Sequence, residues 1–295
     1  MCRHFLISAF LLATADCAEP KSGVVFCTYN IRNWVGDDRP QTKGPAAKPK
    51  SEQEREAVIQ VLRDIRPDII GVCEMGSPAQ FGDFLTRVKT LGLEHSEFVE
   101  AADPERHLAL VSRYPIVARD SRTNVRFLLG GVEQRMRRGI LDVTIQITPD
   151  YQLRCVGAHL KSKLPSAEGE SLVRRHEAAS LRSHLDGLLK GEPSANVLCY
   201  GDFNDTRNEP VFQEISGVRE AASFMESIPA KDEFGDRWTH YWKEADQYSR
   251  IDYLFASKGL APEIVRDTGR VNRSPMWNEA SDHRAVSVTI SPVNR

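Results

Sequence analysis

The chain has 295 residues, of which 41% are hydrophobic, 27% charged and 8% aromatic, and its formal net charge is −2. This composition is typical of a globular protein with a sizeable core, and it excludes a disordered chain. The near-neutral charge also excludes binding to nucleic acid through overall positive charge. Any contact with a phosphate polymer must therefore come from local patches.

The N-terminus has the pattern of a secretory signal peptide. An apolar run over residues 5–15 is followed by small residues around Ala18, which offer a cleavage site. The run is too short to span a bilayer, and the alternatives are an uncleaved anchor or a buried strand. We therefore predict a signal peptide over residues 1–18, a secreted or periplasmic location, and a single domain over residues 22–295.

The six cysteines fall into two groups. Cys2 and Cys17 lie in the predicted signal peptide. Cys17 raises the alternative of a lipoprotein signal, but Asp16 is a poor fit to the small residue that this processing prefers. An exported chain could pair the remaining cysteines, yet they lie in apolar, strand-like runs without close spacing, which favours free and buried thiols. They are Cys27, Cys73, Cys155 and Cys199.

Apolar runs and capping signals predict strands that alternate with helices in the first half of the chain. The continuous apolar run at residues 23–29 predicts a buried strand. Ser51 begins a helix, because Glu54 three residues later completes a capping box, and Pro67 ends it. The other predicted elements of this half are a strand at 68–74, a helix at 78–90 and a strand at 107–112.

The second half mixes hairpins with one long helix. Alternating apolar residues over 139–147 and a return over 153–160 predict a β-hairpin. The later predicted elements are a helix at 168–190 and strands at 196–200, 238–242, 251–256 and 284–290. Because alternation is combined with hairpins, the predicted fold class is α/β, with two sheets packed face to face and helices outside.

Short polar motifs follow several of these apolar runs. They supply carboxylates, side-chain amides and two imidazoles. Oxygen-rich sets of this kind suit a hard divalent cation, and such cations suit phosphoryl chemistry. The motifs lie at residues 28–30, 73–75, 158–160, 201–205, 250–253 and 281–283.

Asp202 and Asn204 follow the strand at 196–200. Two residues that lie two positions apart on an extended chain project to the same side, so both could face one pocket. An aspartate can activate water as a base, and an amide can fix that water or a phosphate oxygen. The alternative is an Asx-type turn that caps the strand. The presence of the other motifs favours the functional interpretation.

The remaining acidic and amide candidates also lie at predicted strand ends. Glu74 ends an apolar strand, where a carboxylate is costly unless it is paired or bound to metal; a surface position is the alternative. Asn30 stands in the same relation to the first strand and could share the cation, although a lone Asn is usually a turn residue. A bend would let one of Asp282 and His283 bind metal while the other faces phosphate, and Asp252 could orient a histidine.

The cationic candidates are weaker. His159 ends a predicted strand, where a lone histidine is more often structural, but the following Lys161 favours a phosphate-facing role. Arg138 closes a basic run at 135–138, which fits either a solvated hairpin tip or a grip on phosphate. Arg32, directly after the first motif, is a further weak candidate for phosphate binding.

In this order and spacing, the motifs resemble the endonuclease/exonuclease/phosphatase superfamily over nearly all of residues 24–290. The resemblance implies a four-layer α/β/β/α sandwich and hydrolysis of a phosphate ester with Mg²⁺ or Mn²⁺. It is carried by residues 29–32, 67–74, 112–116, 159–160, 201–205, 250–253 and 281–283.

The resemblance also implies roles for individual residues. Glu74 would bind the metal, with Asn30 and Asp282 beside it. Asp202 would orient or deprotonate the attacking water, helped by Asn204.

The same resemblance assigns the histidines. His283, backed by Asp252, would bind the scissile phosphate and stabilise its developing charge. His159 matches the histidine of the pancreatic-type deoxyribonuclease, sphingomyelinase and inositol-phosphatase branches, and it would bind phosphate or protonate the leaving oxygen.

The predicted function is an exported, metal-dependent phosphodiesterase, and specifically an endonuclease on DNA or RNA, because the motifs and the export signal are similar to those of bacterial extracellular nucleases. The alternative in the same class is a lipid or inositol phosphoesterase; the sequence has no long apolar hairpin of the kind that docks secreted sphingomyelinases on membranes. The alternative from another class is a non-catalytic binding module, which the intact set of ligands disfavours. A zinc hydrolase is disfavoured because no H-E-x-x-H motif occurs.

Overall fold

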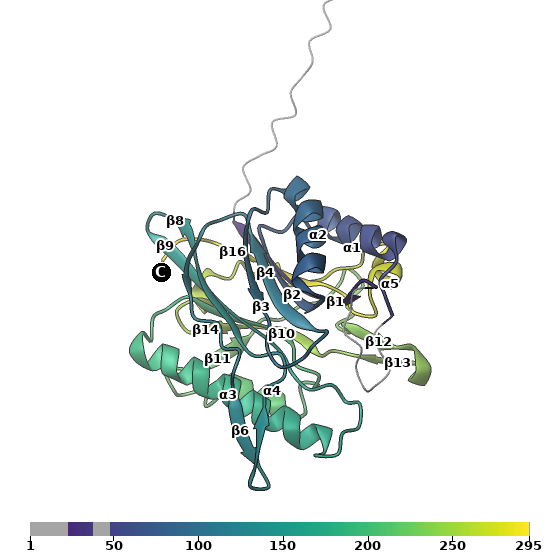
Figure 1. Ribbon diagram of the computed structural model, residues 1–295. Coiled ribbons are helices and arrows are strands. Elements are labelled where there is room, and N and C mark those ends of the chain that lie inside the picture. Colours follow the sequence, from purple (N-terminus) through teal and green to yellow (C-terminus); the bar gives the residue numbers. More distant parts are fainter. Residues whose placement is uncertain (1–22, 38–47, 295) are drawn as a thin grey trace, which may run out of the picture.

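The computed structural model describes residues 23–37 and 48–294. Two six-stranded sheets pack face to face, and helices cover both outer sides (Figure 1). This architecture confirms the predicted α/β fold with layers in the order α/β/β/α. The predicted signal peptide over residues 1–18 lies outside the described residues. Among the described residues, no helix combines the length and the apolar character that crossing a bilayer requires.

The first sheet has the strand order β15-β16-β1-β2-β4-β3. The neighbours β1 and β2 are parallel, and every other neighbouring pair in this sheet is antiparallel. The strands are β15 (Arg270–Val271), β16 (Val286–Ile290), β1 (Val24–Trp34), β2 (Ile69–Met75), β4 (His107–Ser112) and β3 (His95–Val99).

The second sheet, ordered β11-β14-β10-β9-β8-β5, repeats this pattern. Its one parallel pair is β10 with β9, and antiparallel neighbours flank that pair on both sides. The strands are β11 (Met225–Ser227), β14 (Asp252–Ser257), β10 (Val197–Asp202), β9 (Tyr151–His159), β8 (Leu141–Thr148) and β5 (Ile116–Arg119). Each sheet therefore presents the carboxyl ends of a parallel pair at one edge.

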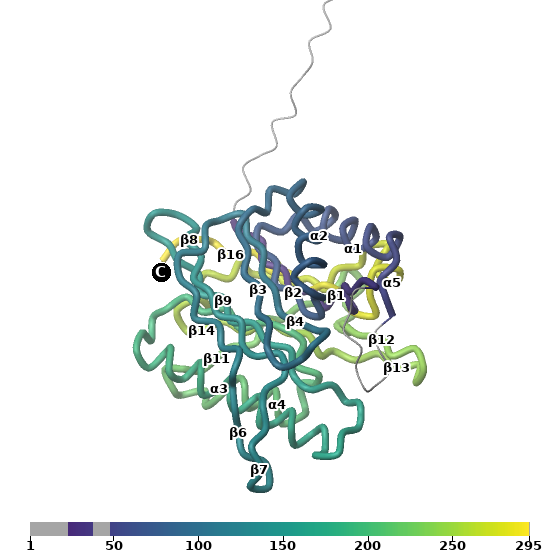
Figure 2. The backbone as a smooth tube through the Cα atoms, in the orientation of Figure 1, coloured from purple at the N-terminus to yellow at the C-terminus, as the bar shows by residue number. Residues whose placement is uncertain are grey.

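Helices and two hairpins complete the described fold. Helices α1 (Glu52–Ile65), α2 (Pro78–Val88) and α5 (Trp277–Ala280) lie on the side of the first sheet, and α3 (Glu170–Gly191) and α4 (Pro210–Ser216) cover the second (Figure 1). The hairpin of β6 (Arg126–Leu129) and β7 (Val132–Arg135) extends beyond α3 (Figure 2). The remaining elements are β12 (His240–Trp242), β13 (Gln247–Ser249) and the short 3₁₀ helices Lys89–Leu91, Lys243–Ala245 and Ala261–Glu263.

Three apolar cores hold the layers together. One lies between the two sheets, one between the first sheet and its helices, and one between the second sheet and α3 and α4. Because strands such as β2 and β10 are buried on both faces, their sequences are continuous apolar runs without alternation. Between the sheets, the ring of Tyr200 fills space that would clash with a side chain at Gly71 or Gly157.

The predicted elements are confirmed, with shifts at their ends. The capping box is present, since Ser51 Oγ accepts from Glu54 N and Glu54 Oε2 accepts from Ser51 N. The predicted β8–β9 hairpin also forms. The strand predicted at 23–29 extends to Trp34, and the strand predicted at 196–200 includes Asp202. The four cysteines of the described chain are free and buried, as predicted.

Candidate functional site

Three neighbouring strands of the second sheet place polar side chains in one row. Asp202 at the end of β10 pairs in register with His159 at the end of β9 and with Asp252 at the start of β14. All three side chains are buried. Neighbouring strands lie about 4.8 Å apart, so the row brings the two carboxylates and the imidazole within reach of one small ligand.

A glycine lets the strand approach its neighbour at this point. Gly201 has φ +142°, and a Cβ added there would lie 1.9 Å from the carbonyl oxygen of Ala158 on β9. Any side chain at this position would push β10 away from β9. Gly201 therefore fixes the position of Asp202 relative to His159.

The chain turns sharply after Asp202. Asn204 has φ +54°, so the segment is not the extended chain from which we expected both side chains to face the same side. Instead, Asn204 N donates to Asp202 Oδ1 over 3.0 Å, and Asn204 Nδ2 donates to the Leu160 carbonyl over 3.1 Å. The Asx-type turn weighed as the alternative is thus present, and it orients the Asp202 carboxylate.

The first sheet contributes an amide and a carboxylate. Asn30 lies on β1 and Glu74 near the end of β2. Asn30 Nδ2 donates to Glu74 Oε1 over 3.2 Å and to Asp202 Oδ2 over 3.0 Å, which joins the two sheets. Glu74 has φ +64°, and its Oε2 accepts from Asn33 N over 3.0 Å. Such backbone strain is typical of positions whose orientation serves a site.

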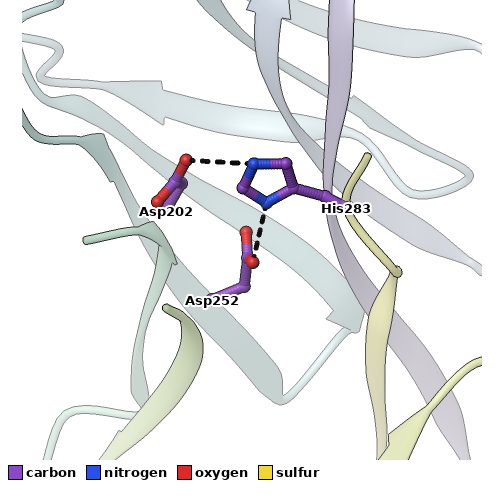
Figure 3. Close-up of side chains that lie close together, drawn as sticks. All are labelled: Asp202, Asp252 and His283. Carbon is purple, nitrogen blue, oxygen red and sulfur yellow. Dashed lines mark hydrogen bonds and ion pairs between the residues drawn. The ribbon is translucent and has the colours of Figure 1, made fainter. Parts of the chain in front are cut away.

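His283 lies between the two aspartates of the row (Figure 3). Its Nδ1 lies 2.9 Å from Asp252 Oδ2, and its Nε2 lies 3.7 Å from Asp202 Oδ2. Ser281 forms the bend that turns His283 inward, because its Oγ accepts from His283 N and donates to the Asn30 carbonyl. The side chains of the adjacent Asp282 and His283 make different contacts, with Arg32 and with Asp252 respectively, as expected for neighbouring residues that diverge.

Asp282 and Arg32, two further predicted site residues, form an ion pair with each other. Asp282 Oδ2 lies 3.6 Å from Arg32 Nε, and both side chains are partly exposed. The Asp282 side chain is about 34% exposed, so it lies at the rim of the site beside the buried Asp202, Asp252 and His283. Arg32 lies at the same rim, as a phosphate-binding residue would.

Burial and charge shift the pKa values of the row in opposite directions. Burial and the negative charge of Asp252 raise the pKa of Asp202 to about 7. Burial opposes a charged His283, but the charges of Asp252 and Asp202 outweigh it and raise the pKa of His283 to about 10. Burial, with the positive charges of Arg138 and His283, lowers the pKa of His159 well below its usual value. The site thus pairs a cationic imidazole with a neutral one.

The donor set fits a divalent cation. One ligand atom each from Asp202, Asp252 and His283 lies within 4.8 Å of the others, a buried group that could hold a metal ion. His283 is already bonded to Asp252, which leaves Glu74 and Asp202 as carboxylates joined by Asn30. Buried carboxylates need a compensating charge, and burial together with the charge of Asp252 raises the pKa of Asp202, in keeping with a site that a cation would stabilise.

The other two predicted phosphate-binding residues differ in their surroundings. Arg138 is buried, so the alternative of a solvated hairpin tip is wrong for this residue. Lys161 donates its ammonium to the carbonyls of Ser162 and Leu164, so that its charge is held by the loop after β9.

Sequence reasoning missed two residues at the site. Arg106 Nε lies 3.9 Å from Glu74 Oε2. The ring of His240 lies 4.6 Å from that of His283, and the two residues form a backbone bridge. Neither residue has a local signal, because Arg106 lies in a polar loop and His240 in a three-residue strand whose partners are distant in sequence.

A two-sheet sandwich with carboxylates and imidazoles buried at one edge has the architecture and donor set of a phosphoesterase. The chain belongs to the endonuclease/exonuclease/phosphatase family, whose model matches residues 27–283. No curated protein sequence matches the chain significantly.

Several solved structures share this fold. The human nocturnin catalytic domain with a bound sulfate anion has 17% identity, covers 92% of this chain and 95% of its own, and gives a TM-score of 0.65. Sphingomyelinase C from Streptomyces griseocarneus has 14% identity, coverage of 91% and 99%, and a TM-score of 0.60. Truncated Caenorhabditis elegans TDP2 has 16% identity, coverage of 91% and 97%, and a TM-score of 0.60. These likenesses show the fold and leave the substrate undetermined.

Proposed function

We propose that this protein is a divalent-metal-dependent phosphodiesterase that cleaves DNA or RNA, acting as an endonuclease. The observation that carries the proposal is the buried group of Asp202, Asp252 and His283, in which His283 hydrogen-bonds to Asp252 and lies 3.7 Å from Asp202. Asn30 joins Asp202 of this group to Glu74 across the sheets. Family membership supports the phosphoesterase class. The motifs that resemble extracellular nucleases support nucleic acid as the substrate.

Each buried side chain suits one part of such a hydrolysis. Asp202, with a pKa near 7, is suited to accept a proton from the attacking water. His283 keeps its positive charge beside Asp252 and would face the negative phosphate. His159 is neutral, and its Nδ1 has no hydrogen-bond partner within the described part of the chain, so it would contact the leaving oxygen or a phosphate oxygen.

We propose Mg²⁺ or Mn²⁺ as the cofactor. Glu74 would hold the cation, with Asn30 and Asp282 as the further predicted ligands. In this structure the amide oxygen of Asn30 accepts from Arg32 N. To bind the ion, Asn30 would therefore turn this oxygen toward it. When bound, the cation would polarise the phosphate oxygens and neutralise developing charge.

A lipid or inositol phosphoesterase is the second candidate function. The likeness to sphingomyelinase C favours it, because that protein shares the fold over nearly its whole length. The two candidates share the metal site and differ in the surrounding loops. A substrate panel separates them.

The experiment measures hydrolysis of supercoiled plasmid, single-stranded DNA, RNA, sphingomyelin and inositol phosphates with Mg²⁺, Mn²⁺ or EDTA. Wild type is compared with Asp202→Asn and with Asp150→Asn, a control in an exposed turn. Metal-dependent nicking that only Asp202→Asn abolishes supports the nuclease. Hydrolysis of a lipid or inositol phosphate alone establishes the second candidate, and inactivity on the whole panel favours a non-catalytic binding module.

We also propose that the protein is exported, either to the periplasm or to the medium. The support is the apolar run at residues 5–15 followed by small residues. Cell fractionation with N-terminal sequencing tests this. Mature protein that begins near residue 19 in an exported fraction is expected, and a full-length cytoplasmic chain would contradict the proposal.

A further inference from the structure

Two loops from different sheets meet beside the end of β9. One is the β3–β4 loop at residues 100–106, and the other is the β7–β8 loop at residues 136–140. Asp103 joins them, because its backbone N donates to the Arg137 carbonyl over 2.8 Å. Its side chain is buried, and Asp103 Oδ1 accepts from the backbone N of Glu105 and of Arg106. The relative position of the two loops is therefore fixed.

Arg138 is buried with part of its guanidinium unused. Its Nε lies 3.0 Å from Asp103 Oδ2, which holds the side chain in place. Its Nη1 is also buried, and among the described residues it has no hydrogen-bond partner. A buried guanidinium N–H without an acceptor is costly, so this geometry indicates that an acceptor from outside the chain completes it.

This guanidinium lies on the far side of His159 from His283. Glu177 accepts from the backbone N of Arg137 and of Lys161, which holds the β7–β8 loop against the end of β9. The strand order β14-β10-β9-β8 then places Arg138, just before β8, about 10 Å from Asp202, or two strand spacings. The lowered pKa of His159 agrees with a cation on this side.

Arg106 faces the same space from the other sheet. Its Nε lies 3.9 Å from Glu74 Oε2 and its Nη1 lies 3.4 Å from Glu105 Oε2, and about a quarter of its side chain is exposed. Because these contacts are long, most N–H groups of the Arg106 guanidinium remain available to bind a ligand. Arg106 and Arg138 flank the same carboxylate, because Arg106 N donates to Asp103 Oδ1 over 3.2 Å and Arg138 Nε lies 3.0 Å from Asp103 Oδ2.

We propose that Arg106 and Arg138 form a second anion subsite, which binds a phosphate group of the substrate other than the scissile one. The proposal rests on the proposed phosphodiesterase function and deepens it. It selects substrates with a second phosphate near the cleaved bond, a chemistry shared by polynucleotides and phosphorylated inositols. It disfavours sphingomyelin, because the only further charge of that headgroup is a quaternary ammonium, which two guanidinium groups repel.

The test compares matched substrates that differ by one phosphate. The first pair is a thymidine dinucleotide with and without a terminal phosphate, placed at either end. The second pair is glycerophosphoinositol with and without a 4-phosphate. For each enzyme the measured quantity is the ratio of kcat/KM within a pair, so a general loss of activity does not affect it. We expect wild type to prefer the phosphorylated member of at least one pair by on the order of tenfold.

The variants are Arg106→Ala, Arg138→Lys and a control, Arg126→Ala. Arg106 is partly exposed, so its truncation leaves the core unchanged, and Lys keeps a cation at position 138 while losing the fork. Arg126 lies on the exposed β6–β7 hairpin. Both subsite variants should bring the ratio toward one, and the control should keep the wild-type ratio. A wild-type ratio of one, or a preference that survives both substitutions, overturns the subsite.

A binding measurement separates this outcome from failure of the proposed function. Inorganic phosphate in EDTA buffer should raise the Tm of wild type, and less so that of Arg106→Ala and Arg138→Lys. If wild type cleaves no phosphodiester but the variants lose this shift, the subsite stands and the proposed activity fails. If the shift is equal in all variants, the subsite is refuted whatever the activity.

Discussion

Replacing Asp252 by Asn tests the central pairing of the site. Asn keeps the shape of the side chain but removes the negative charge that holds the proton of His283, 2.9 Å away. A hydrogen bond to a charged group contributes about 1.5–3 kcal/mol. If this stabilisation acts on the transition state, its loss lowers kcat/KM roughly 10- to 150-fold, since about 1.4 kcal/mol corresponds to a factor of ten.

The assay is metal-dependent hydrolysis of the best diester from the substrate panel, measured from pH 5 to 10. The pKa of His283, about 10 in wild type, should fall in Asp252→Asn because the largest favourable charge is lost. The protonated imidazole, and with it the activity, should then disappear at a lower pH than in wild type. Histidine NMR titration follows the same proton without the reaction.

The control is Asp150→Asn, which removes a charge from an exposed turn far from the row in sequence. It should retain the rate and the pH profile of wild type. An Asp252→Asn enzyme with an unchanged rate and an unchanged His283 titration would refute the reasoning, because Asp252 would then have no electrostatic effect on His283.

Three further predictions concern the metal, the backbone and a helix cap. Glu74→Gln should raise the Mn²⁺ concentration needed for half-maximal binding in calorimetry by on the order of tenfold or more, because one contact to a charged group is lost. Unchanged Mn²⁺ binding would show that Glu74 is not a ligand. Gly201→Ala should lower the free energy of unfolding, measured in urea, by at least about 1–3 kcal/mol, because alanine is strained at this positive φ and its Cβ clashes with β9. The control Gly187→Ala, on the open surface of a helix, should raise the free energy of unfolding by about 0.5–1 kcal/mol. Ser51→Ala should cost about 1 kcal/mol in the same assay through loss of the capping box, and no loss would show that the cap is redundant.

The elements that could be predicted are those whose signals are local. The buried strands β1, β2 and β10 are continuous apolar runs, and α1 carries its own cap. The short strands β3, β11 and β15 were missed, because they have few residues and form by pairing with another strand. The strand β11, for example, is three residues long and exists through its pairing with β14.

The candidate site residues have local sequence signals, whereas the geometry between them depends on tertiary contacts. Asp252 begins β14 and His283 lies just before β16, both recognisable strands, and the fold brings the two side chains within 2.9 Å. The left-handed turn at Asn204 could not be foreseen from spacing, since its side chain hydrogen-bonds to the carbonyl of Leu160, which follows β9 and is 44 residues away in sequence. Asp103 and Arg106 lie in a polar loop, where only tertiary contacts give them a function.

The repeated strand pattern explains why neither half of the chain can form the site alone. Each sheet has one parallel pair at its centre, β1 with β2 and β10 with β9, and the site lies where the carboxyl ends of the two pairs meet. Asn30 from one pair donates to Asp202 of the other, and His283 returns from the C-terminal part of the chain to close the row. Because like charges from both sheets are brought together, the fold creates a position where a bound cation would offset them, which is what the proposed metal-dependent activity requires.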